Sequence, residues 1–269
     1  MPRLLLVVVL LLVALIAAGR LARSEPPESG PVAFPQAPPA ALPRGRTPPP
    51  LQRAPNPGPA QVEQPLVSRT PTIDRLARLA ARRRIVQLGS FTYLDSLLVS
   101  ADSIIRRWGE RVGRPITVTL MAPGLPGFAP WMITRVRDAL RRWEDAGVGI
   151  RFQETADSAQ AEIVIGWIDK FDLDRTGQAD VQSSLDGTIH LVQIRLALRR
   201  SSGPALSADE LLMVATHEIG HALGLPHSGD AQDVMFGTTR TALLSPRDRA
   251  TIALLYSLPP GSLRDETPR

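Results

Sequence analysis

Between residues 114 and 194, several short segments alternate hydrophobic and polar residues with a period of about two, and this alternation predicts β-strands. The predicted strands are 114–120, 149–153, 161–167 and 188–194. Residues 130–146 follow a helical period instead. The predicted apolar side of this helix consists of Trp131, Ile133, Val136, Leu140 and Trp143. This part of the chain therefore combines short strands with one helix.

Two further helices are predicted after these strands, and both have recognisable start signals. The first covers 206–223, where Ser207 is the expected N-cap and Glu210 stands at the spacing of a capping box. The second begins at Ser245 and Pro246, because proline is tolerated in the first turn of a helix, and it ends near Ser257. The predicted order is strand, helix, three strands and two helices.

The N-terminal end carries an unbroken apolar run at 4–18. Its length suits the hydrophobic region of a signal peptide and is short of the roughly 20 residues that span a bilayer. Small residues at 17–19 would allow cleavage, whereas arginines on both sides of the run leave an uncleaved membrane anchor open. Residues 1–23 are therefore predicted to be a signal peptide or an N-terminal anchor, and the rest of the chain is expected outside the cytoplasm.

Proline dominates the next segment, since residues 26–71 hold 15 of the 26 prolines of the chain. We interpret 24–71 as an extended spacer, and the alternative is a tract for proline-binding modules. From 72 to 108 the pattern becomes helical, with five arginines among residues 75–84. This segment could be a pro-segment, a helix facing an anionic membrane, or a cap on the following domain.

The densest chemical signal is the eleven-residue window 217–227, which contains three of the four histidines of the chain. His217 and His221 are four residues apart, so one helical face can offer both imidazoles to a single metal ion. Glu218 lies about 100° from His217 around the helix axis and can stand beside the metal without binding it. Gly224 can end the helix in a left-handed conformation and return His227 as a third ligand. Three ligands leave an open position, as in catalytic zinc sites.

The spacing HExxHxxGxxH resembles that of the metzincin zinc peptidases, in which a methionine turn lies beneath the metal. Met235, eight residues after His227, fits that turn, and Ser228 directly after the third histidine resembles the matrixin branch. The resemblance implies an α+β, zincin-like catalytic domain at 109–260, with a twisted mixed sheet and about three helices, followed by a tail at 261–269.

The resemblance also implies a zinc metalloendopeptidase with one catalytic Zn²⁺, in which Glu218 is the general base and the substrate is a protein or peptide. The substrate would pair with an edge strand, expected at 177–181. The segment 237–239 departs from the proline and tyrosine usual in the family, so substrate preference does not carry over. The alternatives are a catalytically silent, zinc-bearing peptide-binding module and a zinc amidase on another scaffold.

Other residue types limit the remaining functions. The chain has no cysteine, so it lacks both disulfides and the cysteine-bearing latency peptide of many matrixins. His190 has no partner histidines for a second zinc and is interpreted as a strand residue. Calcium is a second candidate cation, with acidic residues available in one region. These residues are Asp169, Asp172, Asp174, Asp180 and Asp186.

The net charge of +5 comes almost entirely from arginine, since Lys170 is the single lysine. No nucleic-acid-binding motif accompanies this charge, and acidic residues are interspersed through the catalytic region, so no nucleic-acid partner is expected. Association with a membrane through the N-terminus is left open, and a monomer is expected.

Overall fold

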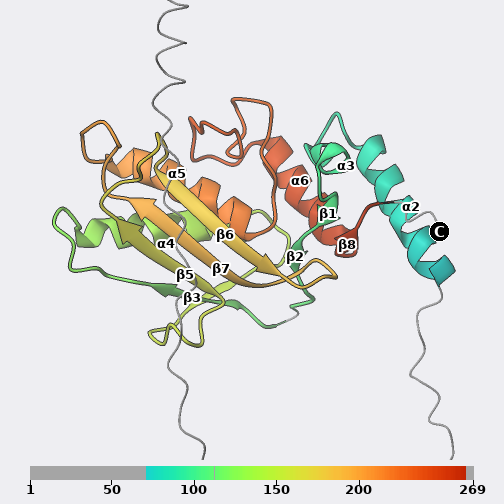
Figure 1. Ribbon diagram of the computed structural model, residues 1–269, viewed down its shortest axis with the longest axis horizontal. Helices are drawn as coiled ribbons and strands as arrows, with labels where there is room; N and C mark the ends of the chain where they lie inside the picture. Colours follow the sequence, from blue (N-terminus) through green and yellow to red (C-terminus); the bar gives the residue numbers. More distant parts are fainter. Residues whose placement is uncertain (1–70, 112, 265–269) are drawn as a thin grey trace, which may run out of the picture. The chain divides into compact units, whose positions relative to one another are not determined.

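The computed structural model describes residues 71–111 and 113–264 of the chain (Figure 1). All of them belong to one compact unit, Val62–Arg269. The predicted signal or anchor segment at 1–23 lies outside the described residues, as does the predicted spacer at 24–71 except for its last residue. No helix within the described ranges has the length and apolar character needed to cross a membrane.

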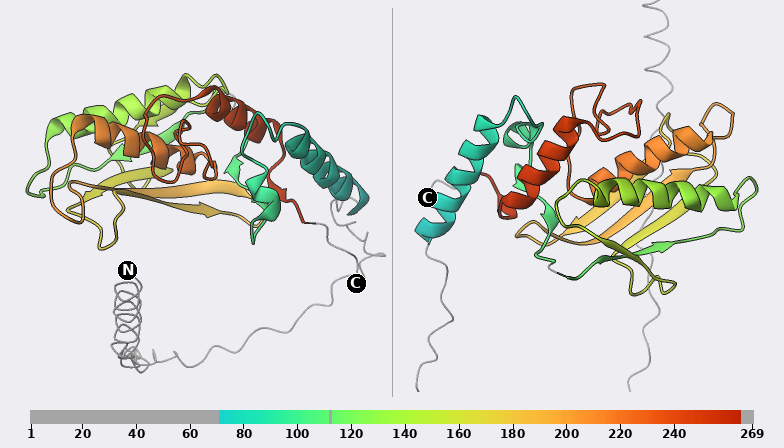
Figure 2. Two further views of the ribbon diagram at one scale, coloured as in Figure 1. Left: turned by 90° about the horizontal axis from the view of Figure 1, so that it is seen from above. Right: turned by 180° about the vertical axis from the view of Figure 1, so that it is seen from behind.

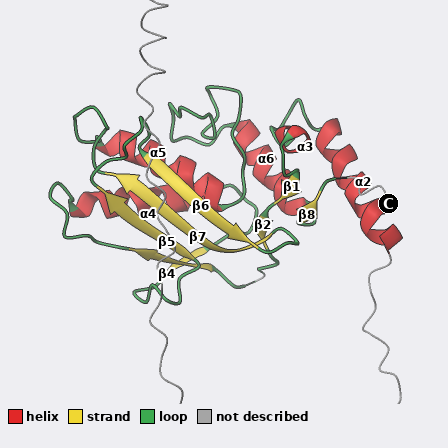
Figure 3. Ribbon diagram, in the orientation of Figure 1, coloured by secondary structure: helices red, strands yellow, loops and turns green. Residues whose placement is uncertain are grey.

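A six-stranded mixed sheet forms the centre of the described unit (Figure 3). Its parallel strands lie in the order β2 (Arg107–Trp108), β7 (Thr188–Ala197), β5 (Ile163–Ile168), β3 (Ile116–Leu120) and β4 (Phe152–Glu154). The sixth strand, β6 (Gly177–Ser183), pairs antiparallel with β7. No other strand of the described part pairs with β6, so β6 is an edge strand of the sheet. The mixed sheet and the edge strand expected at 177–181 are both confirmed.

Two helices, α4 (Pro130–Glu144) and α5 (Ala208–Ala222), lie side by side against one face of the sheet (Figure 2). The indole N–H of Trp143 in α4 donates to the carbonyl oxygen of Thr216 in α5, at 2.8 Å. Both helices and the alternate side chains Ile163 and Ile165 of β5 contribute to the same buried core. The sheet therefore holds α5, the helix of the histidine motif, in a fixed position.

The predicted apolar side of α4 is correct for Val136, Leu140 and Trp143, which are buried, and wrong for Trp131, which is 38% exposed. Trp131 precedes Val136 by five residues, which places it about 140° around the helix from the buried side. The strand predicted at 149–153 lies later, at β4. Positive φ angles at Gly147 and Gly149, 84° and 77°, form the turn that delays it.

Residues 71–108 are only partly helical. They form α2 (Pro71–Gln87), the short α3 (Ser96–Val99), β1 (Ile104–Ile105) and β2. The helical interpretation of Ile104 and Ile105 is wrong, because β1 pairs antiparallel with β8 (Gly261–Ser262) near the other end of the chain. Such a partner, far away in sequence, leaves no local signal.

The helices predicted near the C-terminal end agree closely with the structure. α5 begins after the N-cap Ser207, and α6 (Pro246–Ser257) begins after the N-cap Ser245, each with a capping box. The last strand before α5 is longer than predicted, because β7 continues to Ala197 along the full length of β5.

Candidate metal centre

Helix α5 positions the first two histidines. At its start, the side chain of Glu210 accepts from the backbone N–H of Ser207 at 2.8 Å, and the Ser207 hydroxyl accepts from the Glu210 N–H. This bond and the guanidinium of Arg200 lower the pKa of Glu210 to about 2. The helix then runs unbroken through His217 and His221, which lie one turn apart on the same face.

Gly224 ends this helix and turns the chain back, as predicted. Its φ of 95° is in the left-handed region that favours glycine. A Cβ at this position would collide with the carbonyl group of Arg106, so no side chain fits. The N–H of Gly224 donates to the His221 carbonyl at 2.9 Å, and the N–H of Leu225 donates to the Gly220 carbonyl at 3.1 Å. The turn returns His227 to the face that carries the other histidines.

The three histidines converge with the geometry of a metal site. The Nε2 atom of His221 lies 3.1 Å from that of His217 and 3.1 Å from that of His227. Nitrogen ligands of a tetrahedral zinc ion, each at 2.0–2.1 Å from the metal, stand about 3.3 Å apart. These spacings therefore fit one zinc ion held by three imidazoles. Within the described ranges, this is the one cluster of histidine, cysteine and acidic side chains close enough to hold an ion.

The opposite ring nitrogens of two of these histidines are fixed by backbone carbonyl groups. The Nδ1 atom of His217 lies 2.8 Å from the carbonyl oxygen of Val234, and Nδ1 of His221 lies 2.9 Å from that of Leu225. A carbonyl oxygen only accepts, so each Nδ1 carries the proton and each Nε2 keeps a free lone pair. Burial lowers the pKa of His217, and it lowers that of His221 to about 3. Both imidazoles are therefore neutral, as metal ligands must be.

Glu218 lies beside the triad in a nearly closed environment. Its side chain is buried, and burial, followed by the charge of Asp180, raises its pKa to about 7, whereas Arg175 lowers it. The edge strand approaches it closely at Gly177. A Cβ at Gly177 would lie 2.7 Å from Glu218 Cγ and 2.7 Å from Val214 Cγ1. The carboxyl group is thus held between α5 and β6.

The methionine turn lies under α5, as the spacing from His227 predicts. Met235 is fully buried, and its sulfur occupies the space that a side chain on Gly220 would need. The carbonyl oxygen of Met235 accepts from the N–H of Ser228 at 2.8 Å. The residue before it, Val234, supplies the carbonyl that holds His217. This turn therefore supports the metal site from below through both packing and a hydrogen bond.

A cleft of about 510 Å³ contains the triad and Glu218. Its walls come from β6 and the residues before it, from α5, and from the segment after Met235. The lining residues are 174–179, Arg200, Leu206, Glu210, Met213, Val214, His217, Glu218, His221, His227 and 237–239. The segment 237–239, which differs from the usual family sequence, borders this cleft.

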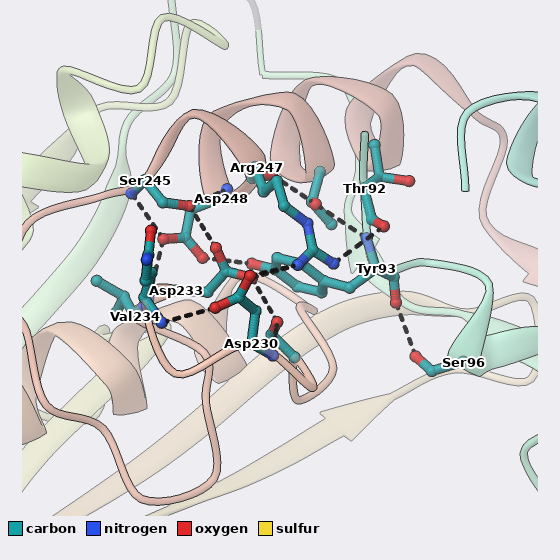
Figure 4. Close-up of polar contacts among 12 residues, drawn as sticks. Thr92, Tyr93, Ser96, Asp230, Asp233, Val234, Ser245, Arg247 and Asp248 are labelled. Atoms are coloured by element: carbon teal, nitrogen blue, oxygen red, sulfur yellow. Dashed lines mark hydrogen bonds and ion pairs between the residues drawn. The ribbon is translucent and has the colours of Figure 1, made fainter. Parts of the chain in front are cut away.

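Two buried carboxylates, Asp233 and Asp248, lie behind the turn and were not predicted from the sequence (Figure 4). Asp248 accepts from the N–H groups of Val234 and Ser245, at 2.9 and 2.8 Å, and Asp233 accepts from the Ser245 hydroxyl at 2.6 Å. Asp233 also bonds the hydroxyl of Ser228, next to His227. The capping-box spacing of Asp248 after Ser245 is a local signal for part of this network. The contact between Asp248 and the turn has no local signal in the sequence.

The other candidate residues lie away from the triad or outside its ligand set. His190 is an exposed residue of β7. Among the acidic residues considered for calcium, Asp169 pairs with Arg199 at 2.6 Å and Asp180 with Arg195 at 3.1 Å. These carboxylates already have cationic partners.

Comparison with known proteins agrees with this geometry. The sequence model of the matrixin family matches residues 131–257. Metalloendoproteinase 4-MMP of Arabidopsis thaliana is 33% identical over 153 residues, covering 53% of this chain and 43% of the relative. Matrix metalloproteinase-26 of Homo sapiens is 49% identical over 51 residues, covering 17% of this chain and 20% of the relative.

A third relative, Metalloendoproteinase 1 of Glycine max, is 41% identical over 64 residues, which cover 22% of this chain and 21% of the relative. The chain thus spans less than half the length of each of these relatives. The matched region contains the converging histidines, Glu218 and the methionine turn. Residues 131–257 of this chain therefore match the matrixin family of metallopeptidases.

Proposed function

We propose that this chain is a zinc-dependent endopeptidase that hydrolyses peptide bonds in proteins outside the cytoplasm, with Glu218 as the general base. The observation that carries the proposal is the place of Glu218. It is a buried carboxyl group beside three converging histidines, in a cleft bordered by an open sheet edge. A site that only stores a metal ion needs no such group.

The proposed division of roles follows from the side chains. His217, His221 and His227 would hold the ion through Nε2. Bound zinc supplies Lewis acidity, which acidifies a water molecule and polarises the peptide carbonyl group. Glu218, with a pKa raised to about 7, accepts a proton more readily than an ordinary carboxylate. It can then return this proton to the departing amine near neutral pH.

The edge strand β6 supports binding of an extended substrate. One side of β6 pairs with β7, and within the described part of the chain the backbone groups on its other side have no strand partner. An extended peptide can add to such an edge through main-chain hydrogen bonds. Gly177, Gln178 and Ala179 border the cleft, so a peptide on this edge would pass beside Glu218.

Two other functions use parts of the same site. A silent binding module would keep the cleft and the open edge, and a zinc amidase would keep the histidines. A binding module gains nothing from a buried carboxyl group with a raised pKa. An amidase that acts on small substrates has no use for an open strand edge. Both features together favour cleavage within a polypeptide.

The test uses the full chain loaded with zinc and a mixed peptide library. We expect the wild type to cleave internal peptide bonds and to lose activity when a chelator removes zinc. Glu218→Gln, which preserves the shape of the side chain, should keep its zinc and lose about 100-fold or more in kcat, the usual contribution of a general base. His221→Ala should lose the zinc itself.

The other outcomes separate the alternatives. Unchanged turnover by Glu218→Gln would contradict the role of Glu218 as the general base. A folded, zinc-loaded wild type that binds peptides without cleaving them would support the silent module. Hydrolysis confined to terminal or non-peptide amide bonds would support the amidase. Equal zinc content in His221→Ala and the wild type would contradict the ligand assignment.

The proposed location rests on the N-terminal sequence and on the family. Matrixins are typically extracellular proteins. The apolar run at 4–18 is the expected export or anchoring signal, and the proline-rich segment would separate the catalytic domain from an envelope or membrane. The proposed substrates are therefore proteins on the outer side of that membrane.

A further inference from the structure

Tyr93 lies in the loop between α2 and α3, well before the residues that match the matrixin family, yet its side chain reaches the buried first turn of α6 (Figure 4). This hydroxyl donates to Oδ1 of Asp248 at 2.8 Å, a carboxylate 155 residues later in the sequence. Both side chains are buried, with exposed fractions of 3% and 0%. Water is thus unable to replace this hydrogen bond easily.

Asp248 also forms a hydrogen bond with the methionine turn. Its second oxygen, Oδ2, accepts from the N–H of Val234 at 2.9 Å. The carbonyl oxygen of Val234 lies 2.8 Å from Nδ1 of His217. Val234 is therefore held through its N–H by Asp248, and its carbonyl oxygen in turn holds His217 of the triad.

We propose that Tyr93 is a positioning residue of the metal centre, which fixes Asp248 and thereby the Val234 carbonyl that orients His217. The inference rests on the zinc site of the proposed function and extends it beyond the residues matched to the family. The carbonyl sets the tautomer and the angle of the imidazole, so Nε2 points toward the other two histidines. A small rotation of the His217 ring would change the distances of its Nε2 atom from the Nε2 atoms of the other two histidines.

The tyrosine is suited to this role because its hydroxyl is a permanent donor. Burial, followed by the nearby charge of Asp248, raises the pKa of Tyr93 above its ordinary value. The hydroxyl therefore keeps its proton at neutral pH and well above it. Removal of this donor would leave Oδ1 of a buried carboxylate short of a hydrogen bond, which is more unfavourable than the simple loss of a contact.

Other contacts hold the loop in place independently of the hydroxyl. The N–H of Tyr93 donates to the Thr251 hydroxyl at 3.3 Å, and the carbonyl oxygen of Tyr93 accepts from the Ser96 hydroxyl at 2.8 Å. The guanidinium of Arg247 lies 5.8 Å from the centre of the Tyr93 ring. Tyr93→Phe therefore removes one hydrogen bond without releasing the segment, which makes the variant a clean test.

The experiment measures zinc affinity of the full chain by competition with a chelator of known affinity. Tyr93→Phe is compared with Thr92→Val, which removes a neighbouring buried hydroxyl that donates to the Leu88 carbonyl at 3.0 Å inside the same segment. We expect zinc binding to weaken about 10-fold in Tyr93→Phe, the lower end for partners behind a metal ligand, and to change less than twofold in Thr92→Val. The melting temperatures of both metal-free variants show whether their stabilities match.

A kinetic comparison adds a second readout. Tyr93→Phe at saturating zinc should lower kcat with KM unchanged, because the contacts of Tyr93 go to Ser96, Arg247, Asp248 and Thr251 and none goes to the substrate edge at β6. Wild-type zinc affinity in Tyr93→Phe, or equal weakening in both variants, would overturn the inference. The affinity measurement needs no turnover, so failure of the proposed peptidase activity would leave this result readable.

Discussion

At the scale of single residues, two carboxyl groups on the same helix have opposite properties. Burial raises the pKa of Glu218 to about 7, whereas the Ser207 N–H and Arg200 lower that of Glu210 to about 2. The difference arises from the groups around each carboxyl: Glu210 has the Ser207 N–H and a guanidinium as partners, whereas Glu218 is buried near an acid, Asp180, whose effect Arg175 opposes. Glu210 is therefore an anion at neutral pH that stabilises the helix, and the raised pKa of Glu218 brings its proton exchange closer to neutral pH than that of an ordinary carboxyl group.

Gly177 controls the space available to Glu218, and Gly177→Ala tests this. The added Cβ would press against Glu218 Cγ and Val214, so the carboxyl group must shift. Since misplacement of a reacting group by about 1 Å can lower a rate about 100-fold, we expect kcat to fall 10- to 100-fold with zinc content unchanged. Steady-state kinetics and metal analysis on the same preparation measure both quantities.

Gly166→Ala in β5 is the matched control, because a Cβ there meets no atom within 4 Å. This variant should keep the wild-type kcat and zinc content. If Gly177→Ala were also fully active, the close approach between β6 and Glu218 would have no role in turnover. If it lost zinc or melted far below the control, the damage would be structural and the positioning argument would be wrong.

At the scale of elements, α5 depends on its capping box for the position of the histidine motif. The folded pKa of Glu210, about 2, lies below its ordinary value of 4.5. A depressed folded pKa means that the group stabilises the fold above pH 4.5 and loses this contribution as pH falls toward 2. Glu210→Gln should therefore melt below the wild type at pH 6, and the gap should shrink steadily from pH 4.5 downward.

Thermal unfolding of the metal-free proteins across this pH range measures the gap, because metal release at low pH would otherwise obscure it. Asp209→Asn, which removes the neighbouring carboxylate of the first turn outside the capping box, is the control. Ser207→Ala, which removes the cap hydroxyl, should be less stable by about 1 kcal/mol. A gap between wild type and Glu210→Gln that stays constant from pH 6 to pH 3 would contradict the assigned role.

The elements predicted correctly from the sequence are those with local signals. The start of α5 follows from Ser207 and Glu210, the start of α6 follows from Ser245 and the first-turn Pro246, and the end of α5 follows from Gly224. In contrast, β1 pairs with β8 across more than 150 residues, and the Tyr93 to Asp248 bond joins positions equally far apart. Such pairs depend on tertiary packing, so a single sequence contains no pattern that reveals them.

The candidate site divides in the same way. The histidine triad was predictable because its spacing is fixed by one helix and one turn. The raised pKa of Glu218 was not, since it depends on burial by β6, a strand some 40 residues earlier in the chain. The support of His217 by Val234 and Asp248 also needed the structure.

At the scale of the whole molecule, the segment before the family-matched residues shares the core of the matrixin-like domain. Ile85, Leu94, Ile105 and Trp108 are all at most 1% exposed. The Trp108 indole donates to the carbonyl oxygen of Ala222 at the end of α5, at 2.9 Å. Helix α5, which carries the first two histidines, is therefore packed against the segment 72–108. Removal of this segment as a pro-segment would take these packing residues away.

This sharing of the core predicts the result of truncation. A chain that begins at residue 109 loses four large buried side chains, each worth roughly 1.5–3 kcal/mol, and the sum of about 6–12 kcal/mol equals the whole stability of a typical domain. We expect it to be aggregated or unfolded and to bind no zinc, whereas a chain that begins at residue 71 should melt cooperatively and bind one zinc ion. Circular dichroism and metal analysis distinguish the two. A stable, zinc-binding 109–269 fragment would show that the N-terminal segment is dispensable, and it would restore the interpretation of 72–108 as a removable pro-segment.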